Sequence, residues 1–356
     1  MTHFGAAARG SGGRAWRVGT TLVSRMGAAS HNSLARGAWL AVFAAVSFGV
    51  TTPIVARAGA GVGPLVTAAL LYAGAWLSTL PSRRTSAEPP LSAAQTTRLA
   101  LLGVLGAGVA PTLLAFGLKR TGGTAGSLLL NLESLFTVLL AWCIYKEPVG
   151  RRVVLALSLM LLGGAALAYG GAGETGEPRL LGALAVIAAT LAWATDNTLT
   201  RPLAALDPVR VVARKAGVGA VLTLGLAVAT REPWPRMAQA AVLLACGATG
   251  YGLSLRLYLL AQRHLGAART GSVFAVAPFV GALAGMLMGD VALRPTTAMA
   301  GGLFAIGVWL HVTERRSQRH VHRHMHGGII HEHDHDHDHD HDHDHDHEHE
   351  HEHGGR

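Results

Sequence analysis

The chain has 356 residues, of which half are hydrophobic and only 14% are charged, and it contains 45 glycines. Together with a mean hydropathy of +0.34, this composition is typical of a membrane protein and excludes an ordinary soluble globular domain. The formal net charge of +9 does not indicate nucleic-acid binding, because the Lys and Arg residues stand singly or in pairs between long apolar runs.

The first 36 residues carry five arginines and no acidic residue, and they lack the long apolar core of a signal peptide. We interpret them as a basic, disordered cytoplasmic leader, or as the product of a start assigned upstream of Met26. An organelle transit peptide, which has a similar Arg-rich and acid-free composition, is the alternative.

Ten apolar runs follow, each close to the roughly 20 residues that a helix needs to cross a hydrocarbon core. They occupy residues 38–57, 63–81, 98–118, 123–144, 152–171, 180–200, 208–230, 236–261, 271–289 and 296–313. The breaks between them are short and rich in turn-forming residues, so no soluble domain fits there. The sequence therefore predicts an all-α membrane protein with ten transmembrane helices.

Lys and Arg residues are distributed unevenly between the alternate loops of this arrangement. The loops and termini on one side carry 19 of them, and the loops on the other side carry seven. Because positively charged loops stay in the cytoplasm, we expect a multi-pass protein of a bacterial inner membrane with both termini in the cytoplasm.

Short sequences recur at a constant distance along the chain, which indicates an internal duplication. The heptapeptide FGVTTPI at 48–54 corresponds to WATDNTL at 193–199, and Gly126-Ser127 corresponds to Gly271-Ser272, each 145 residues later. Because each copy holds an odd number of helices, the two copies must cross the membrane in opposite senses, as an inverted repeat. The predicted domains are the leader at 1–36, a first five-helix repeat at 37–172, a second at 178–313 and a disordered His/Asp/Glu-rich cytoplasmic tail at 314–356.

Two stretches carry a resemblance to a known family: NLESLFTVLLAWCIYKEPVG at 131–150 and YLLAQRHLGAARTGSVFAVAPFVGALAGMLMGD at 258–290. They resemble the EamA-type members of the drug/metabolite transporter superfamily, and the resemblance covers roughly residues 38–313. It implies two five-helix repeats around a central cavity lined chiefly by the first, third, fourth, sixth, eighth and ninth helices. It also implies transport of metabolites, amino acids or drugs, without selecting among these substrates.

Ionisable groups within membrane spans are costly and therefore indicate functional sites. Glu133 lies near the midpoint of the expected helix 123–144, with Asn131 two residues before it. Apolar surroundings disfavour the charged form of a carboxyl group, which suits a group that takes and releases a proton during transport. The alternative is that Glu133 only anchors a buried hydrogen-bond network.

A second polar position is formed by Asp196 and Asn197, toward the cytoplasmic end of the expected helix 180–200. They would contact substrate, or Asp196 would merely pair with Arg201 at the membrane interface. Arg256 would bind an anionic substrate or pair with Glu133, although snorkelling to the headgroups explains it almost as well. For Lys215 we expect snorkelling.

The tail alternates histidines with acidic residues, and imidazole is a common ligand of Zn²⁺, Ni²⁺ and Co²⁺. Its candidate metal ligands are His331, His333, His335, His337, His339, His341, His343, His345, His347, His349, His351 and His353. Residues 331–353 contain no apolar residue, so we expect them to be disordered without metal. Metal buffering or sensing, an expanded repeat of little consequence, and a pH-dependent charge switch remain open.

No phosphate-binding GxxxxGK[ST] motif and no nucleophile-base arrangement stands out, so we expect neither an enzyme nor an ATP-driven pump. The predicted function is secondary transport, as an exporter of a small metabolite or drug-like solute by alternating access, with exchange for protons left open. The alternative is a divalent-metal transporter fed by the tail. The expected partners are the substrate, the lipid bilayer and metal ions at the tail, with a homodimer left open; no cofactor is required and no nucleic acid is expected.

Overall fold

The computed structural model describes residues 12–81, 91–146, 149–169, 179–200, 203, 206–289, 295–313, 320–326 and 329–335. The chain divides into two units, a large one that ends at Val312 and a small one that begins at Thr313. Each unit is described by itself.

The large unit is helical throughout its described elements. Its first half contains α1 (Gly12–Ala58), α2 (Pro64–Leu77), α3 (Ala93–Gly103), the π-helical segment η2 (Val104–Val109), α4 (Ala110–Leu129), α5 (Leu132–Tyr145) and α6 (Arg151–Tyr169). Its second half contains α7 (Arg179–Thr200), α8 (Pro208–Ala229), α9 (Met237–Cys246), the π-helical segment η4 (Gly247–Leu253), α10 (Ser254–Leu265), α11 (Ala267–Phe274), α12 (Ala277–Leu287) and α13 (Pro295–Val312).

Eight stretches among the described residues are helical, long and apolar enough to cross a membrane, and two shorter apolar helices, α2 and α5, accompany them. The chain is a multi-pass membrane protein. Residues 12–36, which we expected to lack regular structure, are part of α1. Their many Ala and Arg residues favour a helix, and the only proline within α1 is Pro53.

Two spans that the sequence predicts as continuous helices are interrupted. The expected helix 123–144 consists of the end of α4 and all of α5, separated at Leu130 and Asn131. The expected helix 271–289 consists of the end of α11 and all of α12, separated at Ala275 and Val276. Asn131 is the one polar residue at the first interruption and the second consists of apolar residues, so each run stays apolar on average and its hydropathy does not indicate a break.

The chain reverses direction at a glycine before each interrupted span. Gly122 has φ 76° and ψ 170°, and Gly266 has φ 80° and ψ 164°. Only glycine adopts such dihedrals without strain.

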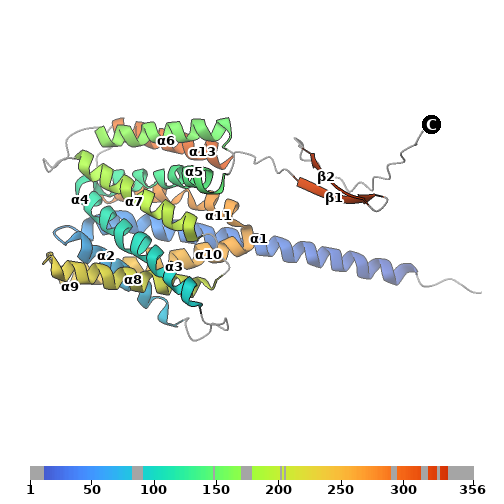
Figure 1. Ribbon diagram of the computed structural model, residues 1–356, viewed down its shortest axis with the longest axis horizontal. Coiled ribbons are helices and arrows are strands. Elements are labelled where there is room, and N and C mark those ends of the chain that lie inside the picture. The colour runs from blue at the N-terminus through green and yellow to red at the C-terminus, as the bar shows by residue number, and fades with distance from the viewer. Residues whose placement is uncertain are drawn as a thin grey trace, which may run out of the picture. The chain divides into compact units, whose positions relative to one another are not determined.

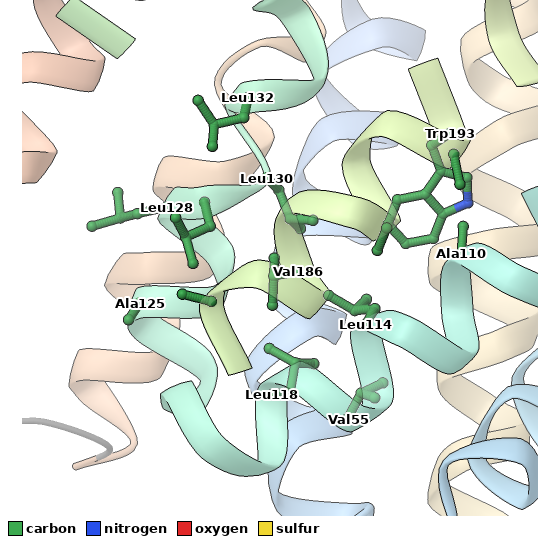
Figure 2. Packing of buried hydrophobic residues seen from close by; sticks show 14 of the residues in the cluster. Val55, Ala110, Leu114, Leu118, Ala125, Leu128, Leu130, Leu132, Val186 and Trp193 are labelled. Atoms are coloured by element: carbon green, nitrogen blue, oxygen red, sulfur yellow. The ribbon is translucent and has the colours of Figure 1, made fainter. Parts of the chain in front are cut away.

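The helices of the two halves pack against one another in matching pairs. α1 contacts α10 and α12, while α7 contacts α4 and α5; α2 contacts η4, while α8 contacts η2. α6 and α13 lie side by side at one edge of the bundle (Figure 1). The main apolar core joins both halves, with Leu114 and Leu130 close to Val186 of α7 (Figure 2).

The small unit contains β1 (His320–His326) and β2 (Ile329–His335), which pair as antiparallel strands. We expected no regular structure in this tail. Alternation of residue types with a period of two suits an extended strand, and a Gly-Gly sequence at 327–328 separates the two strands. The histidines beyond His335 lie outside the described residues.

Candidate functional site

The structure brings together two of the predicted residues, Glu133 and Asn197. Glu133 lies in the first turn of α5, directly after the interruption, and not in the middle of a continuous helix. The Nδ2 of Asn197 on α7 donates a hydrogen bond to Oε1 of Glu133 over 2.8 Å. Glu133 is partly exposed and Asn197 is exposed, so this polar pair is accessible from outside the core. A carboxylate in the first turn of a helix is also favoured by the helix dipole.

Asn131 lies at the interruption itself and is buried. Its Nδ2 donates to the carbonyl of Leu128 over 2.9 Å, and the amide of Ser134 donates to the carbonyl of Asn131 over 3.2 Å. Asn131 therefore stabilises the backbone that positions Glu133, because the interruption leaves carbonyls of α4 without helical partners.

Asp196 is paired with Lys215 of α8, with 2.5 Å between Oδ2 and Nζ. Asp196 is 3% exposed and Lys215 7%, so the expectation that Lys215 reaches the headgroups is wrong. Thr200 completes the arrangement, since its hydroxyl donates to Oδ1 of Asp196 over 3.3 Å. The alternative partner, Arg201, lies outside the described residues. Each charge is compensated by the other, which is the condition for keeping both away from water.

The carbonyl of Gly106 in η2 accepts hydrogen bonds from two side chains. The hydroxyl of Tyr72 donates to it over 2.9 Å, and the indole Nε1 of Trp193 donates over 2.7 Å. π-helical segments shift the backbone hydrogen-bond pattern and frequently occur at functional sites. A Cβ atom at position 106 would overlap the carboxylate of Asp196, so this position requires glycine.

Six aromatic side chains from both halves form a group that we call the aromatic cluster: Phe48, Tyr72, Trp193, Tyr251, Tyr258 and Phe274. Phe48 is at its centre, with ring centroids 5.7 Å from Tyr251 and from Phe274, and 6.3 Å from Trp193. Trp193 and Tyr251 are buried, whereas the other four rings are partly exposed. Figure 2 shows Trp193 beside Ala110 at the start of α4.

Sequence reasoning missed the aromatic cluster. The available signal was that Phe48 and Trp193 open the two repeated heptapeptides, far from the span ends where aromatic residues serve as interface anchors. Trp193 of the cluster and Asn197 of the polar pair lie four residues apart on α7, so their side chains leave the same face of that helix and the polar pair adjoins the cluster.

Arg256 on α10 is directed to the end of α2. Its Nη1 donates to the carbonyl of Ser78, the residue that caps α2, over 3.2 Å. A cation at the C-terminal end of a helix is favoured by the helix dipole and by the unpaired carbonyls there.

A separate groove of about 450 Å³ runs between α1 and α9. Phe43 and Val46, both exposed, line it from α1, and Val242 and Ala245 line it from α9. Its walls are mainly apolar and contain none of the predicted polar residues. The groove is therefore separate from the polar site.

Comparison with known proteins gives a family, a relative and a similar fold. The model of the EamA-like transporter family matches residues 35–169 and 180–313. A protein of Methanothermobacter thermautotrophicus described as an uncharacterized transporter is 29% identical over 192 residues, 52% of this chain and 55% of that protein, so the chain spans little more than half of its length. One solved structure, described only as a crystal structure of a protein, superimposes with a TM-score of 0.58 at 18% identity, over 78% of this chain and 98% of the other. At that identity the likeness concerns the fold alone.

Proposed function

Because the chain belongs to the EamA-like transporter family, we propose that it is a secondary transporter that exports a small metabolite or drug-like solute by alternating access. The observation that carries the proposal is the accessible Glu133–Asn197 pair, placed where the interrupted span packs against α7, the helix that also carries Trp193 of the aromatic cluster. Interrupted helices next to polar side chains are a recurrent way of building a solute site within a membrane.

The proposed architecture is ten membrane spans arranged as two inverted five-helix repeats. Support comes from the family model, which matches the chain twice, and from the matching pairs of helix contacts in the two halves. Each half also has a π-helical segment, then a glycine with positive φ, then an interrupted span.

Lys119 and Arg263 make equivalent contacts, one at each end of the bundle. The Nζ of Lys119 donates to the carbonyl of Val62, and the Nη2 of Arg263 donates to the carbonyl of Leu206 over 3.4 Å. The donor Arg263 follows the donor Lys119 by 144 residues, and the acceptor Leu206 follows the acceptor Val62 by the same number. An inverted repeat gives each such contact an equivalent in the other half, and we propose that the Lys119 contact helps to close the end that contains Val62.

Further contacts close the end that contains Val62. Both Leu65 and Val66 donate their backbone amides to the carboxylate of Glu232, over 2.8 and 3.1 Å. Gln239 donates to the carbonyls of Ala58 and Ala60. The distribution of Lys and Arg in the sequence places this end outside the cytoplasm. We therefore propose a conformation closed to the outside and accessible from the cytoplasm, in a bacterial inner membrane with both termini in the cytoplasm.

Within this proposal Glu133 binds the solute or the exchanged proton, Asn197 orients its carboxylate, and Asn131 holds the helix interruption. Asp196 and Arg256 fix neighbouring helices, through Lys215 on α8 and Ser78 at the end of α2.

The tail is proposed as an accessory metal-binding segment. The register of β1 and β2 places three histidine pairs directly across from one another: His320 and His335, His322 and His333, His324 and His331. Opposite residues of an antiparallel pair share one face, so the hairpin groups imidazole-bearing positions. Among the described residues no group of three or more His, Cys, Asp or Glu side chains is arranged to hold a metal ion. Metal transport is therefore the alternative function that the following test distinguishes.

Three cell lines test the proposal: intact protein, Glu133→Gln, and a truncation ending at Ile330. Efflux of a panel of amino acids and dyes, and accumulation of nickel, cobalt and zinc, would be measured in each. We expect Glu133→Gln to abolish efflux and the truncation to preserve it. If Glu133→Gln instead changes metal accumulation and leaves every efflux unchanged, the protein is a metal transporter.

A further inference from the structure

Resting on the proposed transport function, we infer that the solute is an organic cation: an ammonium group attached to an aromatic or apolar body. The inference follows from two features that adjoin along α7: the carboxylate of Glu133, which Asn197 contacts, and the aromatic cluster, to which Trp193 belongs one turn away.

The cationic side chains of Lys215 and Arg256 bind other groups, so the carboxylate of Glu133 can bind a ligand. Its hydrogen-bond partner is the neutral amide of Asn197, whereas the neighbouring Asp196 is neutralised by Lys215 at 2.5 Å. Arg256 lies two residues before Tyr258 on α10, about 200° around the helix axis, and its guanidinium binds the carbonyl of Ser78. A cationic ligand would supply the positive charge that this carboxylate needs when water is displaced.

The aromatic cluster adds a second preference for positive charge. The face of an aromatic ring is negative, and cations bind over it, with more affinity when water is excluded. Phe48, Tyr72, Tyr258 and Phe274 each keep part of their surface exposed although they lie on helices of the packed bundle. These accessible surfaces can contact both an ammonium group and the apolar body attached to it.

Anionic and neutral solutes fit the site less well than a cation does. An anion would be repelled by Glu133 and by the ring faces. A neutral aromatic solute would pack against the rings but would displace water from Glu133 without replacing it by a charge. The site therefore discriminates by charge first and by shape second.

Binding to the purified full-length protein in lipid nanodiscs tests this inference. Three probes share a benzyl body: benzyltrimethylammonium, the neutral benzyl methyl sulfone and the anionic phenylmethanesulfonate. We expect the cation to bind at least tenfold more tightly than either of the others in calorimetric titrations. Equal or tighter binding of the sulfonate would overturn the inference.

Variants separate charge from shape. Glu133→Gln should weaken binding of benzyltrimethylammonium about tenfold and leave the sulfone unchanged, whereas Glu133→Asp should retain the preference for the cation. Phe48→Leu should weaken cation binding about tenfold, within the range of cation–π energies. Phe43→Leu is the matched control, because Phe43 is on the same helix but 59% exposed and outside the cluster. An equal effect of both Phe→Leu changes, in variants that unfold at the normal temperature, would contradict the inference.

Flux measured in proteoliposomes distinguishes this inference from the proposed function. If the cation binds but no probe is transported, the transport proposal fails and the cation site stands. If the sulfonate is transported and the cation does not bind, the transport proposal stands and the cation site fails.

Discussion

Asp196 and Lys215 lie between α7 and α8 where little water reaches either charge. At this scale the sequence identified Asp196, Asn197 and Glu133 as polar residues within spans, and the structure joins the last two. It could not identify Lys215 as the partner of Asp196, because a lysine near a span end is equally compatible with snorkelling. The helix rotation that turns Lys215 inward depends on tertiary packing.

Removal of one member of this pair is predicted to be costly. Asp196→Asn leaves the Lys215 ammonium buried without its counter-charge, and we expect the free energy of unfolding to fall by about 3–5 kcal/mol. The double change Asp196→Leu with Lys215→Met should restore most of the loss. Denaturant titrations of the unchanged protein and these two variants in detergent would measure this, and a double variant as unstable as the single one would contradict it.

Two tyrosines of the aromatic cluster are predicted to respond oppositely to loss of their hydroxyl groups. The hydroxyl of Tyr251 is buried without a hydrogen-bond partner in the described structure, whereas that of Tyr72 donates to Gly106. Tyr251→Phe should therefore stabilise the protein by about 1 kcal/mol, and Tyr72→Phe should destabilise it by a similar amount. Thermal unfolding of both variants measures the difference, and destabilisation by Tyr251→Phe would show that the hydroxyl has a partner.

At the scale of elements, hydropathy located the spans because length and apolar content decide which helices can cross a membrane. It did not locate the interruptions after Leu129 and after Phe274, since leucines flank the single polar Asn131 at the first and the second consists of Ala275 and Val276. The π-helical segments were also not predicted, because their Gly-rich sequences suit ordinary close helix packing equally well.

The glycine that precedes the first interrupted span is predicted to tolerate no side chain. Gly122→Ala should destabilise the protein by about 1–3 kcal/mol, because its φ of 76° and ψ of 170° are accessible almost only to glycine. Gly225→Ala is the control: position 225 lies within α8, and an added Cβ would meet no atom within 4 Å. This change should be neutral or stabilising by up to about 1 kcal/mol. Equal unfolding temperatures of the two variants would contradict the prediction.

At the scale of the whole molecule, the internal repeat was accessible to sequence reasoning because equivalent residues recur 145 positions apart. The closure of the end that contains Val62 was not, because it depends on contacts such as that of Glu232 with the start of α2, between residues far apart in the chain. The aromatic cluster likewise requires the two halves to meet before its members become neighbours.

The closure proposed for the non-cytoplasmic end predicts an accessibility pattern. With Asn197→Cys in a chain whose Cys143 and Cys246 are replaced by serine, an impermeant thiol reagent should label the protein from the cytoplasmic side and only weakly from outside. Glu232→Ala should increase labelling from outside, because the amides of Leu65 and Val66 lose their acceptor. Gln95→Ala, at the equivalent position of Gln239 in the other half, should not. Labelling from outside that is unaffected by Glu232→Ala would contradict the proposed closure.

The carboxylate of Glu232 at the start of α2 has a consequence for the transport cycle. A contact that forms only when its end of the bundle is closed favours the closed conformer, and each 1.4 kcal/mol that it contributes shifts the populations of the two conformers about tenfold. Most molecules are then in the conformer that can bind a solute from the cytoplasm. The apparent affinity for that solute is therefore close to the affinity of this conformer. The same preference makes opening toward the outside the uphill step, and we expect that step to limit turnover.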